Sequence, residues 1–149
     1  VLPYISMHGS TEIMVKHLID ALAARGVTVH AFDLAVTDIG KLAMALVDAA
    51  TLIVGTPTVH VGSHPAVYYA SHLANLLKPK VKYAAIVGSY GWSSKAIEQI
   101  SGLIPNLKVE VLGAVLQKGL PDAAAFKQLD ELATAVAAKH QENPEVTTK

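Results

Sequence analysis

Hydroxyl side chains and a glycine gather close to the start of the chain, between an apolar run and an amphipathic pattern. Ser6, Ser10 and Thr11 can donate hydrogen bonds, and Gly9 lets a ligand approach the backbone closely. The flanking patterns predict a strand followed by a helix, an arrangement that places the positive end of a helix against an anion. The segment therefore favours a phosphate group, although a simple helix cap by Ser10 or Thr11 explains the same residues.

The details of this loop exclude the commoner phosphate-binding motifs. The chain contains neither GxxxxGK[ST] nor GxGxxG, so a triphosphate or a dinucleotide has no support at this turn. Apart from His8, the loop carries no ionisable side chain. Neutral donors suit a monophosphate that is stabilised by many hydrogen bonds, and they favour flavin mononucleotide (FMN).

Composition limits the remaining possibilities. A chain of 149 residues fits one domain with a proper core, and its hydrophobic fraction of 52% is spread over short runs. No run approaches the ~20 apolar residues of a membrane span, so no membrane contact is expected. The formal net charge is zero, which argues against nucleic acid as a partner. The absence of cysteine excludes disulfides, thiolate catalysis and cysteine-ligated metal sites within this sequence.

The first residue is Val1 and not methionine, so we expect a domain of a longer protein. No signal peptide is visible, and we expect a cytoplasmic location.

Apolar runs alternate with amphipathic segments along the chain, and the alternation predicts an α/β fold. Strands are expected at residues 1–6, 27–32, 51–56, 83–89 and 108–116, and helices at 11–25, 38–49, 65–77, 94–104 and 122–139. Asp38 and Asp122 are expected to cap helices, and Pro65 to open one. We predict one domain over residues 1–139, a doubly wound five-stranded parallel sheet with helices on both faces. Residues 140–149 are expected to form a disordered tail.

Ligands of such sheets bind beyond the carboxyl ends of the strands, where the strand order reverses. The segments after the third and fourth expected strands, residues 55–65 and 88–94, are rich in Gly, Ser and Thr. The second of them contains Tyr90 and Trp92, the only tryptophan. A flavin requires a flat aromatic surface and backbone groups around its polar edge, and these loops can supply both.

Three segments carry a resemblance to a known family. YISMHGSTE (4–12), VGTPTVHVGSHPAV (54–67) and VGSYGWSSKA (87–96) resemble the flavin loops of flavodoxins. More narrowly, they resemble the flavodoxin-like domain of flavodiiron proteins, also called A-type flavoproteins. FDLAVTDI (32–39) and KGLPD (118–122) are also similar, so the resemblance extends to about residue 139.

The resemblance implies a flavodoxin-like fold with FMN as its cofactor. The phosphate would be held by Ser6, Met7, His8, Gly9, Ser10 and Thr11. One side of the isoalloxazine would be lined by Pro57, Thr58, Val59, His60, Val61 and Gly62, and the other by Ser89, Tyr90, Gly91, Trp92 and Ser93.

In that family, electrons pass from a redox donor protein or reductase to FMN. They then reach the diiron domain of the parent protein or of a neighbouring subunit, where oxygen or nitric oxide is reduced. The His/Glu/Asp pattern of a diiron site is not found in this sequence. We expect no residue of this chain to act as an acid, a base, a nucleophile or a metal ligand.

Several features depart from the family pattern. His60 and Val61 stand where asparagines are usual, and Ser94 stands where glycine is more usual. The segments 57–64 and 88–94 contain no Asp or Glu, which predicts a less negative second reduction step than in an acid-rimmed flavodoxin. His8, His60 and His64 are expected to lie near one another as polar loop residues.

Two other classes of function remain open. One is a free-standing flavodoxin or an FMN-dependent NAD(P)H:quinone reductase. The other is a cofactor-free doubly wound module that uses the same surface for protein contacts, because a shared fold alone argues for no particular site.

Overall fold

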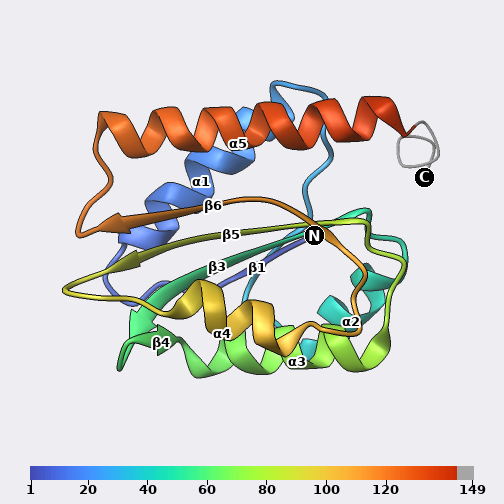
Figure 1. Ribbon diagram of the computed structural model, residues 1–149, viewed down its shortest axis with the longest axis horizontal. Helices are drawn as coiled ribbons and strands as arrows, with labels where there is room; N and C mark the ends of the chain where they lie inside the picture. Colours follow the sequence, from blue (N-terminus) through green and yellow to red (C-terminus); the bar gives the residue numbers. More distant parts are fainter. Residues whose placement is uncertain (144–149) are drawn as a thin grey trace.

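A central sheet lies between two layers of helices in the computed structural model, which describes residues 1–143 (Figure 1). The strands are β1 (Leu2–Tyr4), β2 (Ala31–Asp33), β3 (Thr51–Val59), β4 (Gly62–Ser63), β5 (Tyr83–Tyr90) and β6 (Glu110–Lys118). The helices are α1 (Ser10–Ala23), α2 (Ile39–Val47), α3 (Pro65–Leu77), α4 (Ala96–Leu103) and α5 (Ala123–Glu142). Helices α1 and α5 cover one face, and α2, α3 and α4 cover the other.

The strand order is β2-β1-β3-β5-β6, and all pairs along this path are parallel. From β1 the chain first moves outward to β2 and then returns to add β3 on the other side of β1, so the order reverses between β1 and β3. This arrangement confirms the predicted doubly wound sheet. The carboxyl ends of β1, β3, β5 and β6 point the same way, to the left in Figure 1.

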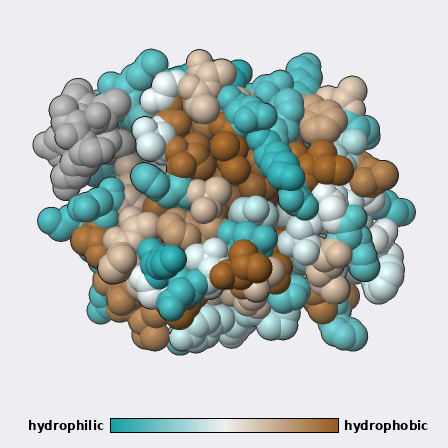
Figure 2. Space-filling model, turned by 180° about the vertical axis from the view of Figure 1, so that it is seen from behind, coloured by the Kyte–Doolittle hydropathy of each residue, from teal (hydrophilic) through white to brown (hydrophobic). Residues whose placement is uncertain are grey.

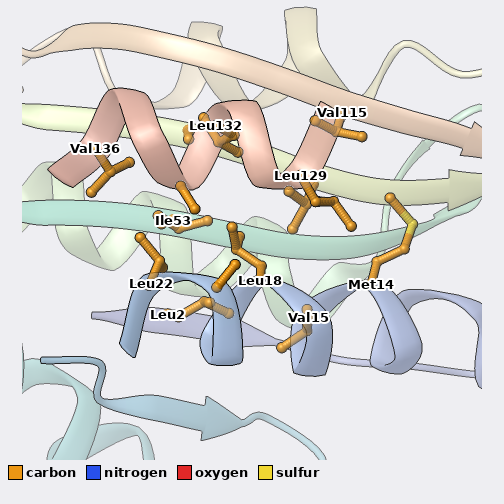
Figure 3. Close-up of a cluster of buried hydrophobic side chains, with 14 residues drawn as sticks. Leu2, Met14, Val15, Leu18, Leu22, Ile53, Val115, Leu129, Leu132 and Val136 are labelled. Carbon is orange, nitrogen blue, oxygen red and sulfur yellow. The ribbon is translucent and has the colours of Figure 1, made fainter. Parts of the chain in front are cut away.

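Two hydrophobic cores hold the helices against the sheet. Figure 3 shows one of them, in which Met14 and Leu18 of α1 and Leu129 of α5 meet Ile53 of β3. The other core joins α2, α3 and α4 to the opposite face through residues such as Leu42, Val67 and Ile100. β3 and β5 are buried between both cores, as their continuous apolar runs predict.

The local signals for helix starts are confirmed. The Asp38 carboxylate accepts a hydrogen bond from the Gly40 backbone N–H at 2.7 Å, and Asp122 accepts one from Ala125 at 2.9 Å. Pro65 is the first residue of α3. Each helix therefore begins close to the predicted position, and the loop before it lies at the end of a strand.

Several expectations are wrong at element ends. β2 begins only at Ala31, whereas the pattern predicts a strand over residues 27–32. β3 continues past residue 56 to Val59 and turns back into β4, forming an antiparallel hairpin that the sequence pattern does not indicate. Residues 140–142, expected in a disordered tail, belong to α5. His140 Nε2 and Thr51 Oγ1 lie 2.7 Å apart, and the Lys139 ammonium lies 3.2 Å from Glu110, so tertiary contacts hold this last turn. The rest of the expected tail, residues 144–149, lies outside the described residues.

Hydrophobic residues also reach the surface. Figure 2 shows them in brown near the centre of the face seen from behind, among hydrophilic residues. Within residues 1–143, none of the helices combines the length and the hydropathy needed to cross a bilayer.

Candidate functional site

A cavity of about 470 Å³ opens at the carboxyl end of the sheet, where the strand order reverses. Four loops contribute to its wall, those after β1, β3, β5 and β6. The lining residues are Ser6, Met7, His8, Ser10, Thr11, Pro57, Thr58, Val59, His60, Val61, Ser89, Tyr90, Gly91, Trp92, Ser93 and Gly119. The fold thus brings together four segments that are separated in the sequence.

The cavity wall contains every residue that the sequence predicts for the site except Gly9 and Gly62. Gly9 sets the backbone of the first loop with a φ of 92°, and Gly62 lies in β4, where a Cβ would be 2.7 Å from the Gln99 side chain. The sequence prediction missed Gly119, which has a φ of 70° and donates its backbone N–H to the Tyr90 carbonyl at 2.9 Å. The signal for it was the glycine of KGLPD, directly after the last strand.

Unused hydrogen-bond donors collect at the start of α1. The Ser6 hydroxyl oxygen accepts hydrogen bonds from the backbone N–H groups of Gly9 and Glu12, both at 3.2 Å. Its own proton stays available to donate. The backbone N–H groups of Ser10 and Thr11 have no acceptor among residues 1–143. These donors lie at the positive end of a 14-residue helix, which suits an anion.

A buried pair of hydroxyls joins this loop to the end of β5. Thr11 is 1% exposed and Ser89 is 9% exposed, and their oxygens lie 2.9 Å apart. Both residues line the cavity.

The opposite part of the wall is a tight hairpin between β3 and β4. Its two turn residues, His60 and Val61, have φ values of 47° and 72°, in the left-handed region that favours glycine. The Lys95 backbone N–H donates to the Val61 carbonyl at 2.6 Å, and the Thr58 hydroxyl donates to Ser94 Oγ at 2.8 Å. These bonds fasten the hairpin to the loop after β5.

Two of the three loop histidines line the cavity, and the third has a capping role. His8 and His60 line the cavity, but His64 caps α3 instead, and its Nδ1 accepts the Ala66 backbone N–H at 3.1 Å. In the described part of the chain, no three His, Cys, Asp or Glu side chains lie together in a group that could hold a metal ion.

The cavity combines two kinds of surface. Hydroxyl and amide donors lie at the α1 end, whereas apolar and aromatic residues, including Val59, Tyr90 and Trp92, form other parts of the wall. Trp92 is 84% exposed, so its ring is available to a ligand. No Asp, Glu, Lys or Arg is among the lining residues. This arrangement, and a volume within the usual range of cofactor pockets, fits a flat apolar ring system that carries a phosphate.

Comparisons with known proteins agree with this geometry. The family model for flavodoxin matches residues 2–143. The chain is 30% identical to the nitric oxide reductase of Moorella thermoacetica over 93% of this chain and 35% of that protein. It is 27% identical to the rubredoxin-oxygen oxidoreductase of Megalodesulfovibrio gigas over 92% of this chain and 34% of that protein. The chain thus spans about a third of the length of these curated relatives.

Solved structures show the same relationship. The rubredoxin oxygen:oxidoreductase of Desulfovibrio gigas superposes with a TM-score of 0.89 at 26% identity, over 95% of this chain and 35% of that one. A flavodoxin from the domain Archaea superposes with a TM-score of 0.78 at 22% identity, over 94% of this chain and 96% of that one, and shows the fold alone. Because the family model covers nearly all described residues, the chain belongs to the flavodoxin family, whose cofactor is FMN.

Proposed function

We propose that this chain is an FMN-binding electron-transfer domain, and that it relays electrons from a redox donor protein or reductase to a diiron site outside the chain. The relatives that support the relay are named as nitric oxide and oxygen reductases, and two solved neighbours are titled as flavodiiron proteins. The match to about a third of their length supports the view that this chain corresponds to one part of such a protein.

The two-sided wall of the cavity is the observation that carries the proposal. The free N–H groups of Ser10 and Thr11 and the Ser6 hydroxyl would hold the FMN phosphate. The hairpin 57–61 and the loop 90–93 would enclose the isoalloxazine, and Ser89, whose Oγ lies 2.9 Å from Thr11 Oγ1, would lie on the phosphate side. Bound FMN would supply the redox chemistry, since a flavin accepts and donates electrons singly or in pairs.

The protein's own residues have binding and electrostatic roles in this proposal. The positive end of α1 and the neutral donors stabilise the phosphate charge, while Val59, Tyr90 and Trp92 cover apolar ring surface and exclude water from it. No lining residue carries a carboxylate, and no acid or base step is assigned to the chain.

The visible absorption spectrum of the purified chain, recorded before and after addition of FMN and gel filtration, tests the cofactor. We expect a retained flavin spectrum with quenched fluorescence. A colourless protein that retains no FMN would contradict the proposal and favour the cofactor-free module.

Electron relay needs a separate experiment. The chain loaded with reduced FMN is mixed under argon with a diiron protein that lacks its own flavin, and flavin reoxidation is followed by absorbance. We expect the diiron protein to accelerate reoxidation. An unchanged rate would remove the relay and leave FMN binding intact.

A free-standing flavodoxin is the second candidate. It fits the flavodoxin family model, which matches residues 2–143. Reduction of a small acceptor protein without any effect on a diiron protein would support it. Steady oxidation of NAD(P)H with a quinone, seen by absorbance, would instead indicate a quinone reductase.

A further inference from the structure

The buried hydroxyls of Thr11 and Ser89 share one hydrogen bond between the first loop and β5. Its direction decides which of the two hydroxyls can donate its proton to an anion. Thr11 Oγ1 and Ser89 Oγ are 2.9 Å apart, and either can be the donor. Within residues 1–143 neither hydroxyl makes another side-chain hydrogen bond. Both residues are at least nine-tenths buried, and both line the cavity.

The number of available protons determines the direction of this hydrogen bond when a phosphate is bound. Each hydroxyl has one proton to donate and two lone pairs to accept with, so the pair shares one proton between its oxygens. A phosphate dianion can only accept. If Thr11 donates to the phosphate, its proton is used, and the bond between the two hydroxyls must be donated by Ser89.

We propose that Ser89 is a positioning residue for phosphate recognition: its hydroxyl donates to Thr11 Oγ1 and so directs the Thr11 proton to the phosphate of FMN. This inference rests on the proposed FMN site and adds a role for Ser89 at a distance from the anion. A hydroxyl that accepts one hydrogen bond is a stronger donor in the next, because successive bonds polarise one another.

Comparison of FMN with riboflavin, which lacks the phosphate, tests the role. Dissociation constants for both flavins are measured by fluorescence quenching for wild type and Ser89→Ala. We expect Ser89→Ala to weaken FMN binding about fivefold and riboflavin binding less than about twofold. Ser89→Thr, which keeps the hydroxyl, is expected to restore the preference for FMN over riboflavin.

The decisive measurement compares the FMN affinity of the single variant Thr11→Val with that of the double variant Thr11→Val/Ser89→Ala. Because Ser89 acts through Thr11, the second substitution should change FMN affinity by less than about twofold once the Thr11 hydroxyl is gone. Far-ultraviolet circular dichroism and riboflavin binding show whether each variant is folded. If Thr11→Val does not fold, Thr11→Ala replaces it. The ratio of the FMN and riboflavin dissociation constants of Ser89→Ala alone also tests whether Ser89 affects phosphate binding selectively.

Ser94→Ala is the matched control, at a residue that follows the lining loop directly but does not line the cavity itself. It also removes a hydroxyl from a cross-loop pair, but its partner is Thr58 of the hairpin. We expect this variant to change the affinities for FMN and riboflavin by the same factor.

The inference would be overturned by equal losses of both flavins in Ser89→Ala, by additive losses in the double variant, or by a phosphate-selective loss in Ser94→Ala. A wild-type chain without FMN affinity would overturn the proposed function itself. Wild-type binding together with an unaffected Ser89→Ala variant would overturn only the role of Ser89.

Discussion

Two loops of one cavity adopt left-handed backbone conformations with very different residues. The first loop uses Gly9 at a φ of 92°, where a residue without a Cβ has no steric penalty. The hairpin uses His60 at 47° and the β-branched Val61 at 72°. A residue such as valine costs about 1–2 kcal/mol in this region. The backbone of the first loop, where we propose that the phosphate binds, is therefore relaxed, whereas the backbone of the hairpin is strained and depends on its neighbours.

Those neighbours are visible in the hydrogen bonds around the hairpin. Gln99 Oε1 of α4 accepts from both the backbone N–H and the hydroxyl of Ser63, at 2.7 and 2.8 Å. The Lys95 backbone N–H holds the Val61 carbonyl. The backbone of the first loop is therefore determined by its own glycine, whereas the backbone of the hairpin is held by hydrogen bonds to Lys95 and to Gln99 of α4.

The largest expected effect is at the relaxed wall. Thr11→Ala should weaken FMN binding by about 1–3 kcal/mol, because in the proposed site it would remove a buried donor to the charged phosphate. A fluorescence titration measures the change, and Thr28→Ala, just before β2 at the opposite end of the sheet, is the control. Unchanged affinity in Thr11→Ala would remove Thr11 from the site.

Substitution of Gly9 tests whether the first loop really depends on glycine. Gly9→Ala places a Cβ on a left-handed residue and should lower the free energy of unfolding by about 1–2 kcal/mol. Gly102→Ala, in the last turn of α4 with open space around its Cβ position, should have the opposite sign. Urea denaturation of both variants without FMN compares them directly, and a neutral Gly9→Ala would erase the contrast between the loops.

A substitution that relieves the backbone strain of the hairpin should stabilise the protein. Val61→Asn should raise the free energy of unfolding by about 1 kcal/mol, since asparagine tolerates the left-handed region that valine avoids. His60→Asn should change it less, because histidine also tolerates this region. If Val61→Asn is destabilising in thermal unfolding, contacts of the valine side chain outweigh the backbone strain.

The reduction potential of bound FMN tests whether the absence of carboxylates around the cavity affects the flavin. His60→Asp places a negative charge in the wall and should make the second reduction potential of bound FMN more negative by on the order of 50 mV. His60→Asn is the neutral control. A potentiometric titration in which both variants match the wild type would show that the hairpin does not influence the flavin charge.

The smallest effect is expected far from both loops. Burial lowers the pKa of His140 below its ordinary value, with a further contribution from the nearby N-terminal charge. The unfolded chain then binds the proton more readily, so stability should decrease as the pH falls below about 6.5. His140→Gln should flatten this part of the pH profile in thermal unfolding, and FMN affinity should not follow it.

Local signals made much of the fold predictable. Asp38, Pro65 and Asp122 act within one turn of their own position, so their roles can be inferred from the sequence without the rest of the molecule. The turn His60–Val61 lacks the Gly, Asn or Asp that marks a hairpin, which is why β4 could not be predicted.

The same division applies to the candidate site. The hydroxyl loop and the aromatic loop stand out by composition, and the parallel sheet brings them together. The capping role of His64 and the contribution of Gly119 depend on the exact course of the backbone, which composition does not determine. The end of α5 was also missed, because Thr51 and Glu110, which hold it, are distant in sequence.

Thr51 lies where both ends of the described chain come together. The Val1 amino group donates to the Thr51 carbonyl at 2.9 Å, and His140 contacts the Thr51 hydroxyl. In Figure 1 the N-terminus and the last turn of α5 lie at the end of the sheet opposite the cavity. A molecule anchored to an electrode through Val1 or through the last turn of α5 would therefore present its cavity to the solution, with the full length of the strands between the anchor and the cavity mouth.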